Sequence, residues 1–277
     1  MRINKRTLTP TLILAALMAA GISACGDKPA PEPSPKVEAP APKAEASAPA
    51  PKVEAPAPAP KAEAPVAAPK VETAAVQIVA GRDYQALKTP QPAASGKNIE
   101  VLEFFWYGCP HCAHLQPSLH EWLKRKSADV AFRRQPAAFQ ESWVQLARTY
   151  YTIEAIDAVD KLHGEVFDAI HKTKVLAPNT LFKDQKPLFD WMATKGVERQ
   201  KFVDAYNSFG VSSRAQRTMD ATSAYEISGT PTMVIVGRYL TAPSMTPPKA
   251  DNTVNYELFF RNVDQVIALA RKNRGGK

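Results

Sequence analysis

The chain has 277 residues, of which 35 are lysine or arginine and 27 are aspartate or glutamate, so its formal net charge is +8 at pH 7. Basic residues after the first hundred occur in short scattered groups, among them those at positions 124–126, 133–134 and 271–274. This pattern is typical of a solvated surface, although it could favour an anionic membrane or acidic substrates. The charge therefore gives no reason to expect nucleic-acid binding.

The first 24 residues have the pattern of a lipoprotein signal peptide. Arg2, Lys5 and Arg6 precede a mostly apolar stretch, residues 8–20, which is too short to span a bilayer comfortably. The small residues that end at Cys25 resemble a bacterial lipobox, which implies cleavage after residue 24 and lipid attachment to Cys25. We expect a mature chain that is lipid-anchored on the periplasmic side of a bacterial membrane. An uncleaved anchor or ordinary secretion is the alternative.

Residues 25–75 are predicted to be the lipidated cysteine and a disordered linker. A Pro-Lys-(Val/Ala)-Glu unit starts at positions 35, 42, 51, 60 and 69, and the linker has no aromatic residue to bury. In polyproline geometry, at about 3.1 Å per residue, about 50 residues reach on the order of 150 Å. We expect a passive tether, and binding to the cell wall or to a partner is the alternative.

An apolar run that begins at Ile99 ends in two cysteines. Residues 99–106 predict a buried strand and residues 113–127 a helix, so that Cys109 and Cys112 stand at the helix start. The thiol of Cys109 would face unpaired N–H groups and the positive end of the helix dipole. Both favour the thiolate, the form that attacks disulfides. The motif indicates disulfide exchange through a redox-active pair, Cys109 and Cys112, with no other cofactor.

Two other interpretations of the cysteine pair stay open. A zinc site is disfavoured because the chain has no second Cys-x-x-Cys, although His114 or His120 could be recruited, and we expect no metal. A purely structural disulfide would close a very small loop and would constrain the unfolded chain little. If Cys25 is acylated, Cys109 and Cys112 are the only thiols left, and no structural disulfide is expected.

Two polar residues near the cysteines are candidates for tuning them. Glu103 interrupts the apolar strand, and a buried carboxylate with a raised pKa could exchange a proton with Cys112. The alternative is that Glu103 lies on the exposed face of an edge strand. His111 lies between the cysteines, and as an imidazolium it would lower the pKa of the Cys109 thiol further.

The rest of the chain predicts a helical block within one α/β domain, residues 76–277. Residues 139–211 form the block, because their apolar residues recur at helical spacing. Gly196 and Gly210 are expected to end helices within it. His163 and His171 lie on an amphipathic segment and are expected to be ordinary surface residues.

The α/β pattern resumes after the helical block. A helix through Ala215, Met219 and Thr222 is predicted, followed by Gly229-Thr230-Pro231-Thr232, in which a proline opens a β-branched strand. Gly237 predicts a hairpin turn, and apolar residues from Tyr256 to Ala270 predict a final helix.

Together the two motifs resemble the thioredoxin superfamily and, within it, the bacterial DsbA-type thiol:disulfide oxidoreductases. The resemblance covers about residues 76–277 and rests on Val101-Leu102-Glu103-Phe104-Phe105, Cys109-Pro110-His111-Cys112 and Gly229-Thr230-Pro231-Thr232. It implies an α/β thioredoxin fold with an inserted α-helical subdomain. It also implies that Pro231 is cis beside the active-site disulfide and that Thr230 presents backbone groups to a substrate peptide. Gln116 departs from the pattern, since family members often carry a second acidic residue in this helix.

The resemblance implies a periplasmic enzyme that introduces disulfides into unfolded exported proteins with thiols. A DsbB-type partner in the inner membrane would reoxidise it. We expect a monomer, because only the tether precedes the fold. Two alternatives remain: an isomerase or reductase kept reduced by a membrane donor, and a non-catalytic lipoprotein adaptor that binds peptides. The redox state of the cysteines in the cell distinguishes an isomerase or reductase from an oxidase. An insulin-reduction assay distinguishes a non-catalytic adaptor from an enzyme.

Overall fold

The computed structural model describes residues 77–275, and Cys25, the signal peptide and the linker lie outside them. The described chain forms a five-stranded sheet in the order β1-β5-β4-β2-β3. β2 is parallel to β3 and antiparallel to β4, and β5 is antiparallel to β4 and β1. The strands are β1 (Gln85–Ala86), β2 (Ile99–Phe105), β3 (Val130–Pro136), β4 (Thr232–Ile235) and β5 (Tyr239–Thr241).

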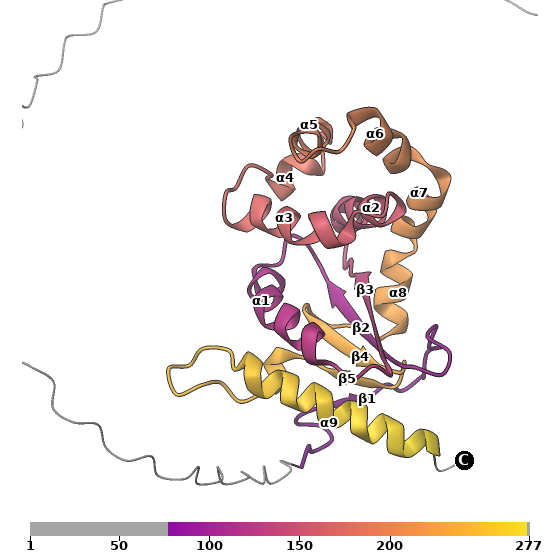
Figure 1. Ribbon diagram of the computed structural model, residues 1–277, viewed down its shortest axis with the longest axis vertical. Helices are drawn as coiled ribbons and strands as arrows, with labels where there is room; N and C mark the ends of the chain where they lie inside the picture. The colour runs from indigo at the N-terminus through magenta and orange to yellow at the C-terminus, as the bar shows by residue number, and fades with distance from the viewer. Residues whose placement is uncertain (1–76, 276–277) are drawn as a thin grey trace, which may run out of the picture. The chain divides into compact units, whose positions relative to one another are not determined.

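Helices lie on both sides of this sheet and above one end of it (Figure 1). None of the described helices is long and apolar enough to cross a membrane. The helices are α1 (Pro110–Arg125), α2 (Glu141–Ala155), α3 (Val159–His171), α4 (Pro178–Leu181), α5 (Lys186–Thr194), α6 (Arg199–Asn207), α7 (Phe209–Gln216), α8 (Thr218–Ala224), the 3₁₀ turn η1 (Pro243–Met245) and α9 (Tyr256–Gly275).

β2 is the strand on which the fold is centred. All seven of its residues are buried, since β3 and β4 pair with its edges and helices cover its faces. Val101 packs with residues of α1 and α9, and Leu102 and Phe104 pack on the opposite face. Glu103 is 0% exposed on this central strand. The alternative that placed Glu103 on an exposed edge strand is therefore wrong.

The predicted active-site helix begins earlier than its apolar spacing indicates. α1 starts at Pro110, a position where proline costs no helical hydrogen bond because the first N–H groups of a helix have no partner within it. Leu115, Leu119 and Trp122 form the buried side of α1 and pack on the sheet. A second proline, Pro117, lies inside the helix.

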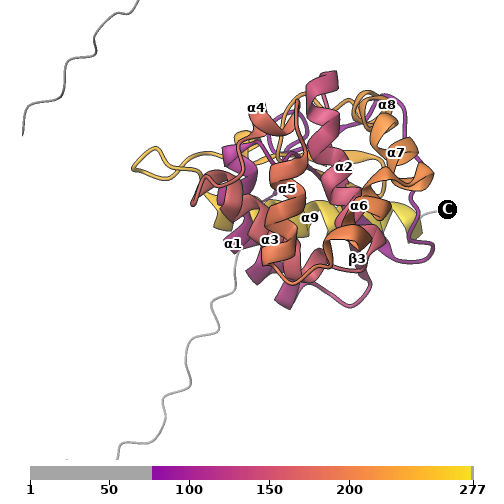
Figure 2. The same cartoon turned by 90° about the horizontal axis from the view of Figure 1, so that it is seen from above.

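Helices α2 to α8 follow β3 and precede β4, and most of them form a layer with a hydrophobic core of its own. Seen from above, α2, α3, α5, α6 and α7 lie in front, and parts of α1 and α9 show beyond them (Figure 2). The apolar faces predicted for this block, including Leu146, Tyr150, Leu162 and Val166, are buried in that core. Both cysteines of the first motif are buried in the same cluster, so the helical layer reaches the end of β2.

Four sequence predictions about this region need correction. Gly210 does not end a helix, because α6 stops at Asn207 and Gly210 is the second residue of α7. The helix expected through residues 215–222 is two helices, α7 and α8, that meet at Arg217. His163 is 4% exposed in the core of the helical layer and is not a surface residue. His171 is half-buried and hydrogen-bonded to the backbone of another segment.

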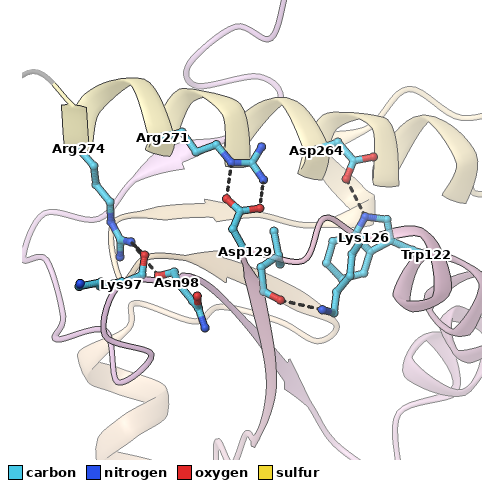
Figure 3. Close-up of polar contacts among 9 residues, drawn as sticks. Lys97, Asn98, Trp122, Lys126, Asp129, Asp264, Arg271 and Arg274 are labelled. Carbon is cyan, nitrogen blue, oxygen red and sulfur yellow. Dashed lines mark hydrogen bonds and ion pairs between the residues drawn. The ribbon is translucent and has the colours of Figure 1, made fainter.

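The C-terminal helix α9 is fastened to the face of the sheet that α1 also covers (Figure 3). Trp122 of α1 donates its indole N–H to the Asp264 carboxylate at 2.8 Å. Arg271 forms a two-pronged ion pair with Asp129 at 2.7 and 2.6 Å, next to the start of β3. Arg274 donates to two backbone carbonyls just before β2. The helix therefore ties together three segments on that side of the sheet.

A glycine substitution tests the hairpin between β4 and β5. Gly237 has φ +62°, and a Cβ there would lie 2.0 Å from the Gln91 carbonyl oxygen. Gly237→Ala should lower the free energy of unfolding by about 2 kcal/mol or more. As a control, Gly164→Ala in α3 adds a methyl group into open space and should raise it by roughly 0.5–1 kcal/mol. Urea unfolding measures both, and equal effects of the two substitutions would contradict the argument.

Candidate functional site

Cys109 is the N-cap residue of α1 and follows β2 after a short turn. Its backbone is extended, with φ −87° and ψ 117°, so the chain changes direction there. The N–H of Cys109 donates to the Trp106 carbonyl at 3.0 Å, which closes a turn from Trp106 to Cys109. Cys112 lies on the first turn of the helix. The sequence thus places two thiols side by side at a helix start.

The sulfur of Cys109 lies where a thiolate is stabilised. A hydrogen bond with the Cys112 thiol is the largest cause that lowers the pKa of Cys109 to about 5, and burial opposes it. The side chain of Thr230 and the backbone N–H groups of Cys112 and His111 lower this pKa further. These N–H groups belong to the first turn of α1, where donors have no partner within the helix. Cys109 is therefore a thiolate at neutral pH in the reduced protein.

Cys112 has the opposite environment. It is 0% exposed, against 8% for Cys109. Burial raises the pKa of Cys112 well above its ordinary value, and the hydrogen bond with Cys109 and the charge of Cys109 raise it further. Both cysteines are free thiols in this structure. At neutral pH the pair therefore carries one negative charge, on the more accessible sulfur.

The second sequence motif lies directly against Cys109. The Thr230–Pro231 peptide bond is cis, as the family resemblance implied. The Cys109 sulfur lies 3.3 Å from the Thr230 carbonyl oxygen, to which it donates a hydrogen bond when protonated, although 121 residues separate the two along the chain. A hollow of about 410 Å³ adjoins this loop, lined by His111, residues 228–232, η1 and Tyr256 among others. The hollow therefore borders Thr230, whose carbonyl contacts the reactive sulfur.

Glu103 lies beneath the cysteines, as the sequence predicted, with two polar partners. Burial raises its pKa, while Arg134 and a hydrogen bond from Gln116 oppose the rise. The Arg134 guanidinium is 3.4 Å from one carboxylate oxygen. The Gln116 amide donates to the other at 3.4 Å and to the Cys112 carbonyl at 3.2 Å. Gln116, where family members often have an acid, thus connects Glu103 to the backbone of Cys112.

His111 is exposed beside the hollow, and its backbone N–H is one of the groups that lower the Cys109 pKa. Exposure to water screens any contribution from its imidazole. Within residues 77–275 no group of three or more histidine, cysteine or acidic side chains could hold a metal ion.

Sequence reasoning missed several residues around the pair. Arg134 was expected on a solvated face, yet its side chain is 17% exposed and pairs with Glu103. The register Glu103↔Arg134 in the parallel β2–β3 ladder makes them direct neighbours, which no local pattern reveals. Tyr107, His163 and His171 also meet behind the cysteines. The only available signal was that two histidines eight residues apart fall on one side of a helix.

The described domain matches a family model and curated relatives. The model for a DSBA-like thioredoxin domain matches residues 100–251. The chain is 39% identical over 169 residues to the thiol:disulfide interchange protein DsbA of Burkholderia cepacia, which covers 60% of this chain and 77% of the relative. It is 37% identical over 198 residues to DsbA of Bordetella parapertussis, which covers 72% of this chain and 89% of the relative.

Solved structures agree with the sequence comparison. The crystal structure of Pseudomonas aeruginosa DsbA superposes with a TM-score of 0.63 at 31% identity, covering 72% of this chain and 97% of that one. Reduced DsbA1 of Neisseria meningitidis superposes with a TM-score of 0.60 at 27% identity, covering 73% of this chain and 100% of that one. The thioredoxin fold with inserted helices is therefore confirmed.

Two substitutions of Cys112 test the cause of the low Cys109 pKa. Cys112→Ala removes the hydrogen bond to the Cys109 thiolate. It should raise that pKa by about one to two pH units, since a hydrogen bond to a charged group contributes about 1.5–3 kcal/mol. Cys112→Ser keeps a hydroxyl donor and should leave the pKa of Cys109 closer to about 5. Thiolate ultraviolet absorbance against pH measures both, and identical titrations would show that the helix start alone sets the value.

Proposed function

Because the chain belongs to the family of DsbA-like thioredoxin domains and is a protein-disulfide oxidoreductase, we propose that it introduces disulfides into exported proteins through Cys109 and Cys112. One observation carries the direction of transfer: the pKa of Cys109 is about 5, while that of Cys112 is raised well above its ordinary value. A stable thiolate at the more accessible cysteine favours the reduced enzyme, so the oxidised enzyme gives its disulfide away.

The first step forms a mixed disulfide. A substrate thiolate attacks the Cys109 sulfur of the oxidised enzyme, because that sulfur is the more accessible of the two. A bond forms between the substrate sulfur and Cys109, and the bond between Cys109 and Cys112 breaks. Cys112 leaves with the electron pair and takes up a proton, as its raised pKa requires.

The second step releases the product. A second substrate thiolate attacks the substrate sulfur of the mixed disulfide, and Cys109 leaves as a thiolate. Its low pKa makes it a good leaving group. The substrate has lost two electrons and gained a disulfide, and the enzyme pair holds those electrons as a thiolate and a thiol. A DsbB-type partner in the inner membrane then reoxidises the pair.

Glu103 is the proposed proton carrier for Cys112. Its carboxyl is fully buried with a raised pKa, and its negative charge is one of the causes that raise the pKa of Cys112. Gln116 joins the two by hydrogen bonds to the Glu103 carboxylate and to the Cys112 carbonyl. A carboxyl in this position can give up a proton when Cys112 becomes the leaving group.

The substrate peptide is proposed to lie along Thr230 and Pro231. The Thr230 carbonyl is within hydrogen-bond distance of the Cys109 sulfur, so backbone groups of an extended peptide bound at this loop would place its own sulfur near Cys109. The adjoining hollow, with His111 on its rim, offers room for neighbouring side chains. Unfolded proteins present such extended segments.

The proposed location is the periplasmic side of a bacterial membrane. The lipobox-like sequence that ends at Cys25 supports a lipid anchor, and the linker supports a catalytic domain held at a distance from it. We propose that the enzyme acts there as a monomer.

The two redox forms should differ in stability. The folded-state pKa of Cys109, about 5, lies below the value of about 8.5 for an unfolded thiol, so ionisation stabilises the reduced fold. This contribution is complete above the unfolded pKa, shrinks as the pH falls and is lost below the folded pKa. Urea melts at neutral pH should show the reduced form as more stable, by a margin that shrinks as the pH falls and is lost below about pH 5. A more stable oxidised form at neutral pH would contradict the oxidase.

Trapping of substrates tests the role of each sulfur. Cys112→Ala should accumulate mixed disulfides between Cys109 and exported proteins, visible on non-reducing gels of cell extracts. Cys109→Ala should accumulate none, because Cys112 is fully buried. Equal trapping by both variants would mean that the nucleophile is wrongly assigned.

Cys25→Ser should release the protein from membranes without loss of thiol chemistry. The linker separates the anchor from the domain, so a fragment of residues 76–277 should reduce insulin at the rate of the full chain. Membrane fractionation and an insulin assay measure the two outcomes. A wild-type protein found free of the membrane would contradict the proposed lipid anchor at Cys25.

A further inference from the structure

The turn that delivers Cys109 to the helix start is held by the helical layer. The turn runs from Trp106 to Cys109, and its closing hydrogen bond joins the Cys109 N–H to the Trp106 carbonyl at 3.0 Å. The backbone of Trp106 also makes a hydrogen bond to the Cys112 sulfur, which lowers the pKa of Cys112. The orientation of this turn therefore fixes backbone contacts to both cysteines.

Tyr107 is the second residue of the turn, and two histidines of α3 hold it. The Nε2–H of His171 donates to the Tyr107 carbonyl at 2.7 Å. That carbonyl belongs to the central peptide of the turn, so a rotation of this peptide would break the bond. The Tyr107 phenol forms a hydrogen bond with Nδ1 of His163 at 2.9 Å. One residue is thus fixed at its side chain and at its backbone by the same helix.

Burying the polar imidazole of His163 costs free energy, and the contact with Tyr107 offsets only part of that cost. Burial lowers its pKa well below the ordinary value, so the imidazole is neutral. Its Nε2 atom is buried without a hydrogen-bond partner among the described residues. A leucine would fill the same apolar surroundings without an unpaired polar atom. The contact with Tyr107 is the one hydrogen bond that the ring makes within residues 77–275.

The neighbouring residues of the turn support the same arrangement. The Trp106 ring stacks on Trp143 of α2, with centroids 3.7 Å apart and planes 2° from parallel. Gly108 lies under the Trp106 ring, where a Cβ would be 2.4 Å from a ring carbon. Each residue between β2 and Cys109 is therefore restrained by the helical layer or by the turn itself.

We propose that His163 and His171 are positioning residues for Cys109, acting through Tyr107, so that the helical layer sets the reactivity of the cysteine pair. This inference rests on the proposed function, because it assumes that Cys109 and Cys112 are the redox pair. Without the hydrogen bonds from His163 and His171 to Tyr107, the turn should relax and move the first-turn N–H groups of α1 away from the Cys109 sulfur. The thiolate would then be less stable and the enzyme less oxidising.

His171→Leu removes the donor to the turn, and His171→Gln replaces it with an amide N–H at a similar distance from the backbone. His171→Leu should raise the pKa of Cys109 and weaken oxidation of glutathione at equilibrium by about fivefold, the effect of one hydrogen bond. His171→Gln should restore most of both. Tyr107→Phe removes only the phenol contact and should change both quantities in the same direction. Tyr206→Phe, which removes a buried phenol that donates to Gln145 in the helical layer, is the matched control and should change neither.

If the histidine contacts to Tyr107 were only structural, their loss would lower the stability of the oxidised and reduced forms equally. The glutathione equilibrium and the Cys109 pKa would then stay unchanged. That result for His171→Leu, or for Tyr107→Phe should His171→Leu not fold, would overturn the inference. Failure of the proposed function is distinguishable, because the wild-type protein would then form no Cys109–Cys112 disulfide in glutathione buffer or would titrate as an ordinary thiol.

Discussion

The convergence of hydrogen-bond donors on the Cys109 sulfur is the interaction on which the chemistry of this domain depends. The donors are the Cys112 thiol, the first-turn N–H groups of α1 and the side chain of Thr230. None of them is unusual alone, since every helix start exposes N–H groups. Their effect arises because the sulfur is partly buried among them, where water competes less for the thiolate. A difference between the two sulfurs follows directly, because the donor that stabilises Cys109 is the thiol of Cys112.

Maintaining that arrangement requires a rigid strand in front of the helix. β2 is buried on both faces and paired on both edges, so the residue where it ends is fixed in space. The turn after it is then restrained from the helical layer, with α2 on Trp106 and α3 on Tyr107. From the opposite side, the Thr230 carbonyl approaches the sulfur. Three segments distant in sequence therefore contact Cys109 or the turn that precedes it.

The two buried carboxylates of β2, Glu100 and Glu103, are each paired with an arginine of β3. Glu103 lies 3.4 Å from Arg134, and Glu100 lies 2.9 Å from Arg133. A buried carboxylate without a partner would be expensive, and the arginines come from β3, the strand parallel to β2. The two ion pairs have different surroundings. Glu103 lies next to the cysteines, whereas Glu100 also accepts a hydrogen bond from the loop before β2.

The amino-acid sequence by itself determined the reactive pair, the strand and helix that carry it, and the helical character of residues 139–211. These features follow from local rules: the period at which apolar residues recur, and two cysteines three residues apart. The sequence could not place His163 and His171, because a histidine on an amphipathic helix is compatible with either face until the partner of that helix is known. It also could not pair Arg134 with Glu103, since strand register depends on long-range contacts. Tertiary structure alone decided which polar groups surround the sulfur, because those groups come from segments as far as 121 residues away along the chain.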